Sequence, residues 1–98
     1  MILSFGDKRT GDIFNGVSTS KTRRVPPELL EAAARKLDLI NSAVLIDDLK
    51  IPPGNKLEKL KGDLKEFYSI RVNDQFRIIF KFENGSADKV EFLDYHKG

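Results

Sequence analysis

Hydrophobic and polar residues follow one period in the first half of the chain and another in the second. After Pro26-Pro27, apolar residues recur at helical spacing, which predicts a helix with one buried face that carries Leu30, Ala33, Ala34, Leu37 and Ile40. From Leu57 onward the period changes to two, which predicts strands over residues 57–60, 67–72, 76–82 and 88–95. Shorter signals predict a strand over residues 2–5, a helix over residues 7–15 that ends at Gly16, and a helical turn within residues 44–49.

The order of these elements predicts an α+β fold. Two N-terminal helices should pack on one face of a small, mostly antiparallel sheet, and the other face of the sheet should stay free. A chain of 98 residues buries one modest core, so residues 1–98 are expected to form a single domain.

The hydrophobic pattern also selects the register of the two hairpins. A three-residue loop over residues 73–75 pairs Arg71 with Arg77 and keeps the apolar stripe unbroken, whereas a two-residue loop breaks it. A three-residue loop over residues 84–86 likewise pairs Phe80 with Val90. The expected core face carries Tyr68, Ile70, Val72, Phe76, Ile78, Phe80, Val90 and Phe92. The opposite face carries Arg71, Arg77, Lys81, Glu91 and Tyr95.

Composition and charge narrow the chemistry. The chain has no cysteine and one histidine, so disulfides and thiolate sites are excluded and neither a metal nor a cofactor is expected. Apolar runs are too short for a membrane span and the N-terminus is unlike a signal peptide, so we expect a cytoplasmic protein with no membrane partner. The net charge of +2 is uneven, because Lys21, Arg23 and Arg24 form a cluster without an acid. Such clusters are often solvated faces, but they also suit a polyanion partner.

Two features indicate a site. Arg71 and Arg77 should oppose each other across the sheet, and directly opposed like charges destabilise a sheet by about 0.2–1 kcal/mol. Unless Glu91 or a distant acid neutralises the pair, an anion is expected between them, and replacing either arginine should keep or raise stability. Guanidinium groups suit phosphate oxygens. The single histidine, His96, can exchange a proton near neutral pH, although a terminal histidine is often only a solvated surface group.

These groups, with Tyr95, Lys59 and Lys61, are the parts of a metal-free ribonuclease. In such an enzyme the 2′-hydroxyl of the RNA attacks the adjacent phosphorus, and the protein supplies a base, an acid and positive charge. Strict alternation places His96 on the face away from the two arginines, so the last residues must bend for the site to close.

Three segments resemble the HigB-type toxins of the RelE superfamily: residues 52–62, residues 68–80 and the ending Asp94-Tyr95-His96. The resemblance implies a RelE-like fold and the toxin of a type II toxin–antitoxin system. Such a toxin is an endoribonuclease that cuts translated mRNA on the ribosome. It also implies a cognate HigA-type helix-turn-helix antitoxin as partner, with operator DNA reached only through that antitoxin.

The same resemblance assigns roles by position. It places Arg77, Asp94, Tyr95 and His96 in the active site and makes Lys61 and Arg71 phosphate contacts. Glu58 stands where many relatives have histidine, and a carboxylate there can act as a base but cannot stabilise phosphate charge. Further candidates for RNA contact are Lys59, Lys21, Arg23 and Arg24.

Two functions of other classes remain open. A non-catalytic RNA-binding or DNA-binding module could use the same basic face, and it would leave RNA intact. An antitoxin-like interaction domain is disfavoured, because the chain has no helix-turn-helix pattern.

Overall fold

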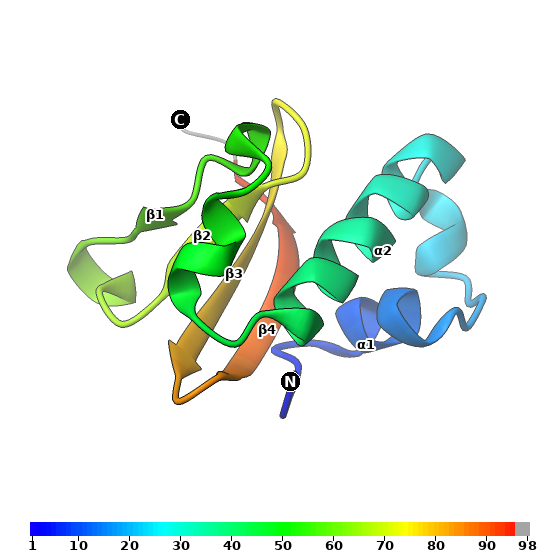
Figure 1. Ribbon diagram of the computed structural model, residues 1–98. Helices are drawn as coiled ribbons and strands as arrows, with labels where there is room; N and C mark the ends of the chain where they lie inside the picture. The colour runs from blue at the N-terminus through cyan, green and yellow to red at the C-terminus, as the bar shows by residue number, and fades with distance from the viewer. Residues whose placement is uncertain (96–98) are drawn as a thin grey trace.

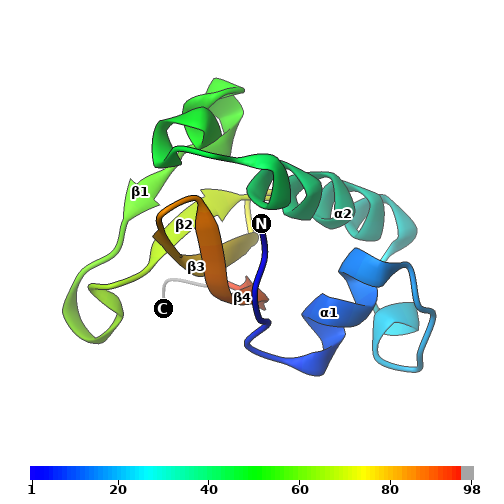
Figure 2. The ribbon, with the colours of Figure 1, turned by 60° about the horizontal axis from the view of Figure 1, so that its bottom comes forward.

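A computed structural model describes residues 1–95, so the expectations about His96 lie outside the described residues. A four-stranded antiparallel sheet in the order β1-β2-β3-β4 forms one layer of the molecule. The long helix α2 crosses one face of this sheet, and α1 lies beside α2 and β4 (Figures 1 and 2). The predicted α+β architecture is therefore confirmed.

Helix α1 begins and ends, and helix α2 begins, where the sequence signals place them. In α1 (Lys8–Asn15), the Asp7 carboxylate accepts a hydrogen bond from the Thr10 N–H at 3.0 Å, and Gly16 ends the helix with a φ of +71°. Helix α2 (Pro27–Ser42) starts with proline in its first turn. Its buried face consists of Leu29, Ala33, Leu37 and Ile40, so Leu29 replaces the predicted Leu30 and Ala34, which are half-buried. The short 3₁₀ helices are η1 (Thr22–Arg24), η2 (Ile46–Lys50), η3 (Pro53–Asn55) and η4 (Gly62–Leu64).

The sheet is the predicted antiparallel meander. Its strands are β1 (Glu58–Lys59), β2 (Tyr68–Arg71), β3 (Phe76–Glu83) and β4 (Ser86–Asp94). The first hairpin has the predicted register, because Arg71 pairs with Arg77 and Ile70 pairs with Ile78. Strand β1 is shorter than expected and pairs with β2 through two residues only.

The second hairpin differs from the prediction near its turn. Glu83 pairs with Ser86, so the connection is the two-residue turn Asn84-Gly85, in which both residues have positive φ (+52° and +78°). Nearer the middle of the strands, Phe80 faces both Lys89 and Val90 in a β-bulge, and Lys89 has a φ of +52°. The bulge offsets the shorter turn, and the predicted pairing of Ile78 with Phe92 is therefore restored beyond it.

The N-terminal segment is not the strand that the pattern predicts. It runs parallel to β4 and meets it in two isolated bridges, Ile2 with Ala87 and Phe5 with Val90. The bulge at Lys89 lies between the two bridged positions of β4, so a continuous ladder cannot form there.

The core lies between the predicted face of the sheet and the helices. Ile70, Ile78, Phe80, Val90 and Phe92 are fully buried, which confirms that face. The opposite face is not wholly free, contrary to the expectation, because Ser69 and Ile79 are buried on it. Ser69 is covered because the Arg77 side chain lies across it and binds it. No helix within residues 1–95 is long and apolar enough to cross a membrane.

Candidate functional site

A hollow of about 340 Å³ lies where the segment before β1, the β2–β3 turn and the end of β4 meet. Its lining residues are Lys56, Glu58, Arg71, Asn73, Asp74, Arg77 and Tyr95. Four residues proposed from the sequence therefore share one space: Glu58, Arg71, Arg77 and Tyr95.

Arg77 is the most buried charged group of the hollow, with 12% of its side chain exposed. Its Nε donates to the Ser69 hydroxyl at 2.8 Å, and its Nη2 donates to the Lys56 carbonyl oxygen at 2.8 Å. The Glu58 carboxylate lies 3.6 Å from the same Nη2. The guanidinium thus ties the chain before β1 to strands β2 and β3, and it orients the Glu58 carboxylate toward the hollow.

Arg71 has a different environment. It forms an ion pair with Asp74, which lies in the β2–β3 turn and is 98% exposed. The Asn73 side-chain oxygen fixes this turn, because it accepts hydrogen bonds from the N–H groups of Gln75 (2.9 Å) and Phe76 (2.7 Å). The turn therefore holds Asp74 in reach of Arg71.

The expected unneutralised arginine pair is wrong. Each guanidinium has a carboxylate of its own, Glu58 for Arg77 and Asp74 for Arg71. Glu91, which the sequence offered as a neutralising acid, belongs to another environment, where burial and then the Asp7 carboxylate raise its pKa. The expected gain of stability on removing Arg77 therefore has no basis, since that side chain is bound on several sides.

Tyr95 closes the hollow at the end of β4. Its backbone N–H donates to the Gln75 carbonyl oxygen at 2.8 Å, and the centre of its ring lies 5.7 Å from the guanidinium carbon of Arg77. This is within the range of a cation–π contact. A ring held in this way offers a surface on which a nucleobase can stack.

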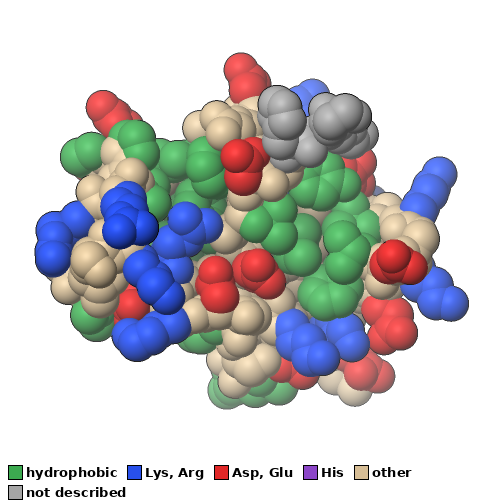
Figure 3. Space-filling view, turned by 180° about the vertical axis from the view of Figure 1, so that it is seen from behind, with side chains coloured by type: hydrophobic (Ala, Val, Ile, Leu, Met, Phe, Trp, Pro, Cys, Tyr) green, Lys and Arg blue, Asp and Glu red, His purple; other side chains and the backbone are tan. Residues whose placement is uncertain are grey.

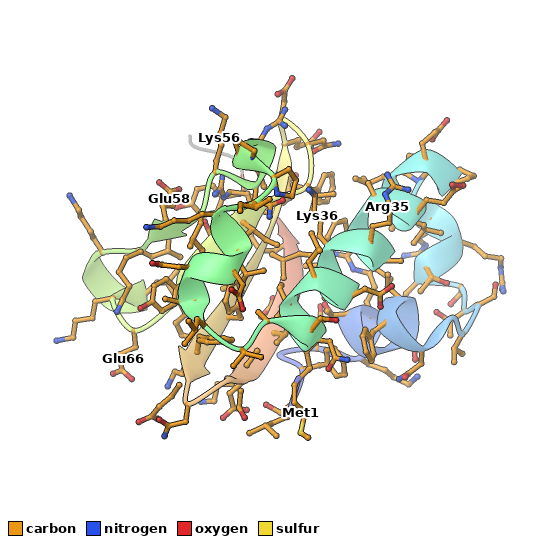
Figure 4. The ribbon with its side chains drawn as sticks, viewed as in Figure 1. Met1, Arg35, Lys36, Lys56, Glu58 and Glu66 are labelled. Atoms are coloured by element: carbon orange, nitrogen blue, oxygen red, sulfur yellow. The ribbon has the colours of Figure 1, made fainter. Side chains whose placement is uncertain are left out.

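The segment that carries Lys56 and Glu58 is anchored to the interior of the molecule by Asn55. The Asn55 side chain is fully buried, and its amide donates to the carbonyl oxygens of Leu49 (3.1 Å) and Ile51 (3.3 Å). Its side-chain oxygen accepts from the Lys36 ammonium, which reaches over from α2, at 2.5 Å (Figure 4). Burial, and then the positive charges of Arg35 and Arg71, lower the pKa of Lys36. Positive charge is thus concentrated beside the Arg71 end of the hollow.

Other residues proposed from the sequence lie elsewhere. Asp94 is on the face of β4 that carries Phe92, and its carboxylate accepts from the Gln75 amide at 2.9 Å. The Lys59 ammonium lies over the Tyr68 ring, 4.9 Å from its centre, and Lys61 precedes η4.

The basic cluster of Lys21, Arg23 and Arg24 lies in and next to η1, beyond α2 from the strands β1 and β2 (Figure 1). In Figure 3, Lys and Arg side chains gather at this helical end of the molecule. The cluster therefore cannot share a single phosphate with the hollow.

Four contributors to the hollow and its walls were not predicted from the sequence: Ser69, Lys56, Asn73 and Asp74. Ser69 could have been found by strict alternation, because it shares a face with Arg71 and Arg77. Asn73 is typical of a turn that its own side chain closes. Lys56 contributes a backbone carbonyl from a position with a φ of +46°, and no local pattern indicates such a long-range contact.

Known proteins resemble the chain over nearly its whole length. The family model described as RelE-like toxin of type II toxin-antitoxin system HigB matches residues 3–96. Toxin HigB-1 of Vibrio cholerae serotype O1 is 40% identical over 97 residues, which cover 99% of both chains. Endoribonuclease HigB of Proteus vulgaris is 35% identical over 96 residues, which cover 98% of this chain and 100% of the relative.

Solved structures share the fold at low sequence identity. The toxin–antitoxin complex YoeB-YefM from Staphylococcus aureus has a chain with a TM-score of 0.62 and 16% identity, and the match covers 99% of this chain and 97% of that chain. YafQ from Escherichia coli strain BL21(DE3) has a TM-score of 0.59 and 15% identity, with 97% and 92% covered. Because the family model spans almost all of the sequence, the chain belongs to the family of RelE-like HigB toxins of type II toxin–antitoxin systems.

Proposed function

We propose that this toxin is a ribosome-dependent endoribonuclease that cuts translated mRNA without a metal ion. The observation that carries the proposal is the hollow, in which the Glu58 carboxylate, the Tyr95 ring and the guanidinium groups of Arg71 and Arg77 face one space. The Proteus vulgaris relative is named an endoribonuclease, and its similarity to this chain supports the same activity. A partner antitoxin follows from the family, and we propose that it is of the HigA helix-turn-helix type.

The proposed reaction needs no group beyond the chain and the RNA. The Glu58 carboxylate takes the proton of a ribose 2′-hydroxyl, and the 2′-oxygen forms a bond to the adjacent phosphorus. The bond from phosphorus to the 5′-oxygen breaks, which leaves a 2′,3′-cyclic phosphate and a 5′-hydroxyl. His96 gives the proton that the leaving 5′-oxygen takes up. Arg71 and Arg77 stabilise the charge that develops on the phosphoryl oxygens.

The remaining residues serve binding and orientation. Tyr95 stacks on a base beside the scissile phosphate. Asp94 supports the end of β4 through its hydrogen bond with Gln75 and so helps to position Tyr95. Lys59 and Lys61 contact neighbouring phosphates. The cluster of Lys21, Arg23 and Arg24, at the other end of the molecule, contacts ribosomal RNA.

Purified protein, ribosomes and a translated mRNA test the proposal. We expect new 5′ ends in the mRNA, with and without a chelator that binds transition metals but leaves the Mg²⁺ of the ribosome in place, and no cut where the ribose 2′-hydroxyl is replaced by hydrogen. His96→Ala and Glu58→Gln should each slow single-turnover cleavage by about 10²- to 10⁴-fold. Asp47→Asn is the control, because it removes one charge from an exposed ion pair with Lys50 outside the hollow.

Three results would contradict parts of the proposal. Binding of mRNA without any cut would favour the non-catalytic module. Cleavage by His96→Ala or Glu58→Gln at the parent rate would remove that residue from the reaction. Rapid cleavage of free RNA at many sites would mean that the ribosome is not required.

A further inference from the structure

The two arginines of the hollow differ in how much of their hydrogen-bonding capacity the fold already uses. Arg77 donates from Nε to Ser69 and from Nη2 to Lys56, and only 12% of its side chain is exposed. Arg71 is 32% exposed, and its ion pair is with a carboxylate in the adjacent turn. Arg71 is therefore the guanidinium that can exchange its partner without breaking the contacts that hold β1.

The partner of Arg71 lies in a turn that the Asn73 side chain closes. Asn73 accepts two backbone hydrogen bonds and so fixes the path of the chain on both sides of Asp74. Asp74 is almost fully exposed, and exposed ion pairs hold weakly because water competes for both partners. A phosphate oxygen, which offers Arg71 the same kind of acceptor, can therefore take the place of the carboxylate.

Positive charge around this position favours an incoming anion once the carboxylate has moved. Lys56 lines the same hollow, and the pKa of Lys36 is lowered in part by its proximity to Arg71. A carboxylate bound among these groups cancels part of their field, and it also repels an RNA phosphate that approaches.

We propose that Asp74 occupies the phosphate-binding position of Arg71 in the free protein and that an RNA phosphate binds there only by displacing it. The inference rests on the proposed function, since it names how that site selects its substrate. RNA held on the ribosome has a high effective concentration at the hollow and displaces the carboxylate, whereas free RNA does so poorly. Asp74 is thus a specificity-determining residue, and it disfavours free RNA.

The test compares Asp74→Asn with Asp47→Asn. Both variants remove one negative charge, and both break an exposed ion pair between residues three positions apart. The probe is a short single-stranded RNA with 2′-O-methyl riboses, which cannot be cut. Its Kd is measured by fluorescence anisotropy at about 0.15 M salt, where the Debye length is about 8 Å. We expect about two- to fivefold tighter binding by Asp74→Asn, because one competing carboxylate is gone and exposed ion pairs contribute up to about 1 kcal/mol. Asp47→Asn should change the Kd by less than about twofold, because its charge is screened at a distance.

A second pair of variants shows whether the effect passes through Arg71. In an Arg71→Gln background, Asp74→Asn should improve binding no more than Asp47→Asn does, because the position that Asp74 occupies no longer exists. Equal effects of Asp74→Asn and Asp47→Asn in the parent, or an undiminished effect in the Arg71→Gln background, would overturn the inference. The assay measures binding without cleavage, so a failure of the endoribonuclease proposal would leave this result unchanged and would be seen separately.

Discussion

Arg77 both faces the hollow and holds its walls together. Its donors satisfy the fully buried Ser69 hydroxyl and a backbone carbonyl that precedes β1. Loss of the charged partner of a buried polar group lowers the free energy of unfolding strongly, whereas an exposed ion pair contributes little to it. The two arginines, equivalent in the sequence pattern, should therefore differ in their contribution to stability.

Arg77→Ala should lower the free energy of unfolding by about 2 kcal/mol, because hydrogen bonds to charged groups in partly buried sites have about this value. Arg71→Ala is the matched comparison and should change it by less than about 1 kcal/mol, since its ion pair with Asp74 is exposed. Urea denaturation followed by circular dichroism measures both. Equal stability of the two variants would show that the Arg77 contacts contribute no more to the free energy of unfolding than the Arg71 ion pair does.

At the scale of elements, the β3–β4 hairpin depends on backbone conformations that favour glycine or asparagine. Gly85 has a φ of +78°, and a Cβ added there would lie 3.3 Å from the Val44 carbonyl oxygen. We expect Gly85→Ala to lower the free energy of unfolding by about 1–2 kcal/mol, because L residues are strained in this region. Gly54→Ala is the control, since a Cβ there meets no atom within 4 Å. A melting temperature unchanged in Gly85→Ala would contradict the assigned turn.

The hairpin also shows how far the sequence can be read. Asn84-Gly85 is the strongest two-residue turn signal in the chain. The sequence nevertheless predicted a three-residue loop, because without a bulge only that loop pairs Phe80 with Val90. The bulge at Lys89 reconciles the two, and no single-strand pattern indicates a bulge. The helices and the first hairpin followed their local signals because capping residues and the apolar stripe both agreed there.

The candidate site was predictable to a smaller extent. Strand alternation placed Arg71, Arg77 and Tyr95 on one face, and the structure brings them together. Two partners of the arginines were missed, because Asp74 binds across a turn and Lys56 contributes its backbone rather than its side chain. Glu58 was proposed as a base, but its ion pair with Arg77 was not foreseen. Alternation reports which face a side chain occupies, but it does not report what lies beside it.

At the scale of the whole molecule, two carboxylates should give opposite pH dependences of stability. Burial, and then the Asp7 charge, raise the pKa of Glu91 above 4.5, while Arg9 lowers it. The folded state therefore binds this proton more tightly than the unfolded chain, and stability falls as pH rises from the unfolded value through the raised one. Hydrogen bonds from the N–H groups of Leu45 and Val44 lower the pKa of Asp48, so its contribution is lost as pH falls.

Glu91→Gln should be more stable than the parent at neutral pH, and the difference should disappear below pH 4.5, where the parent carboxyl is protonated in both states. Asp48→Asn should be less stable than the parent at neutral pH, and its difference should shrink in acid. Urea denaturation across the pH range gives both curves. A Glu91→Gln difference that grows as pH falls would mean that the Glu91 pKa is not raised.

The short pairing of strand β1 affects the fraction of time in which Glu58 lies in the hollow. The strand pairs with β2 through two residues only. The chain just before it is held by the Arg77 contact with Lys56 and by the buried Asn55. Such a segment opens more readily than the long β3–β4 hairpin, and each opening carries Glu58 away from the guanidinium groups. The complete hollow is therefore in equilibrium with a form in which β1 has opened. Warming should move the Glu58 carboxylate out of the hollow at temperatures well below the melting of the core.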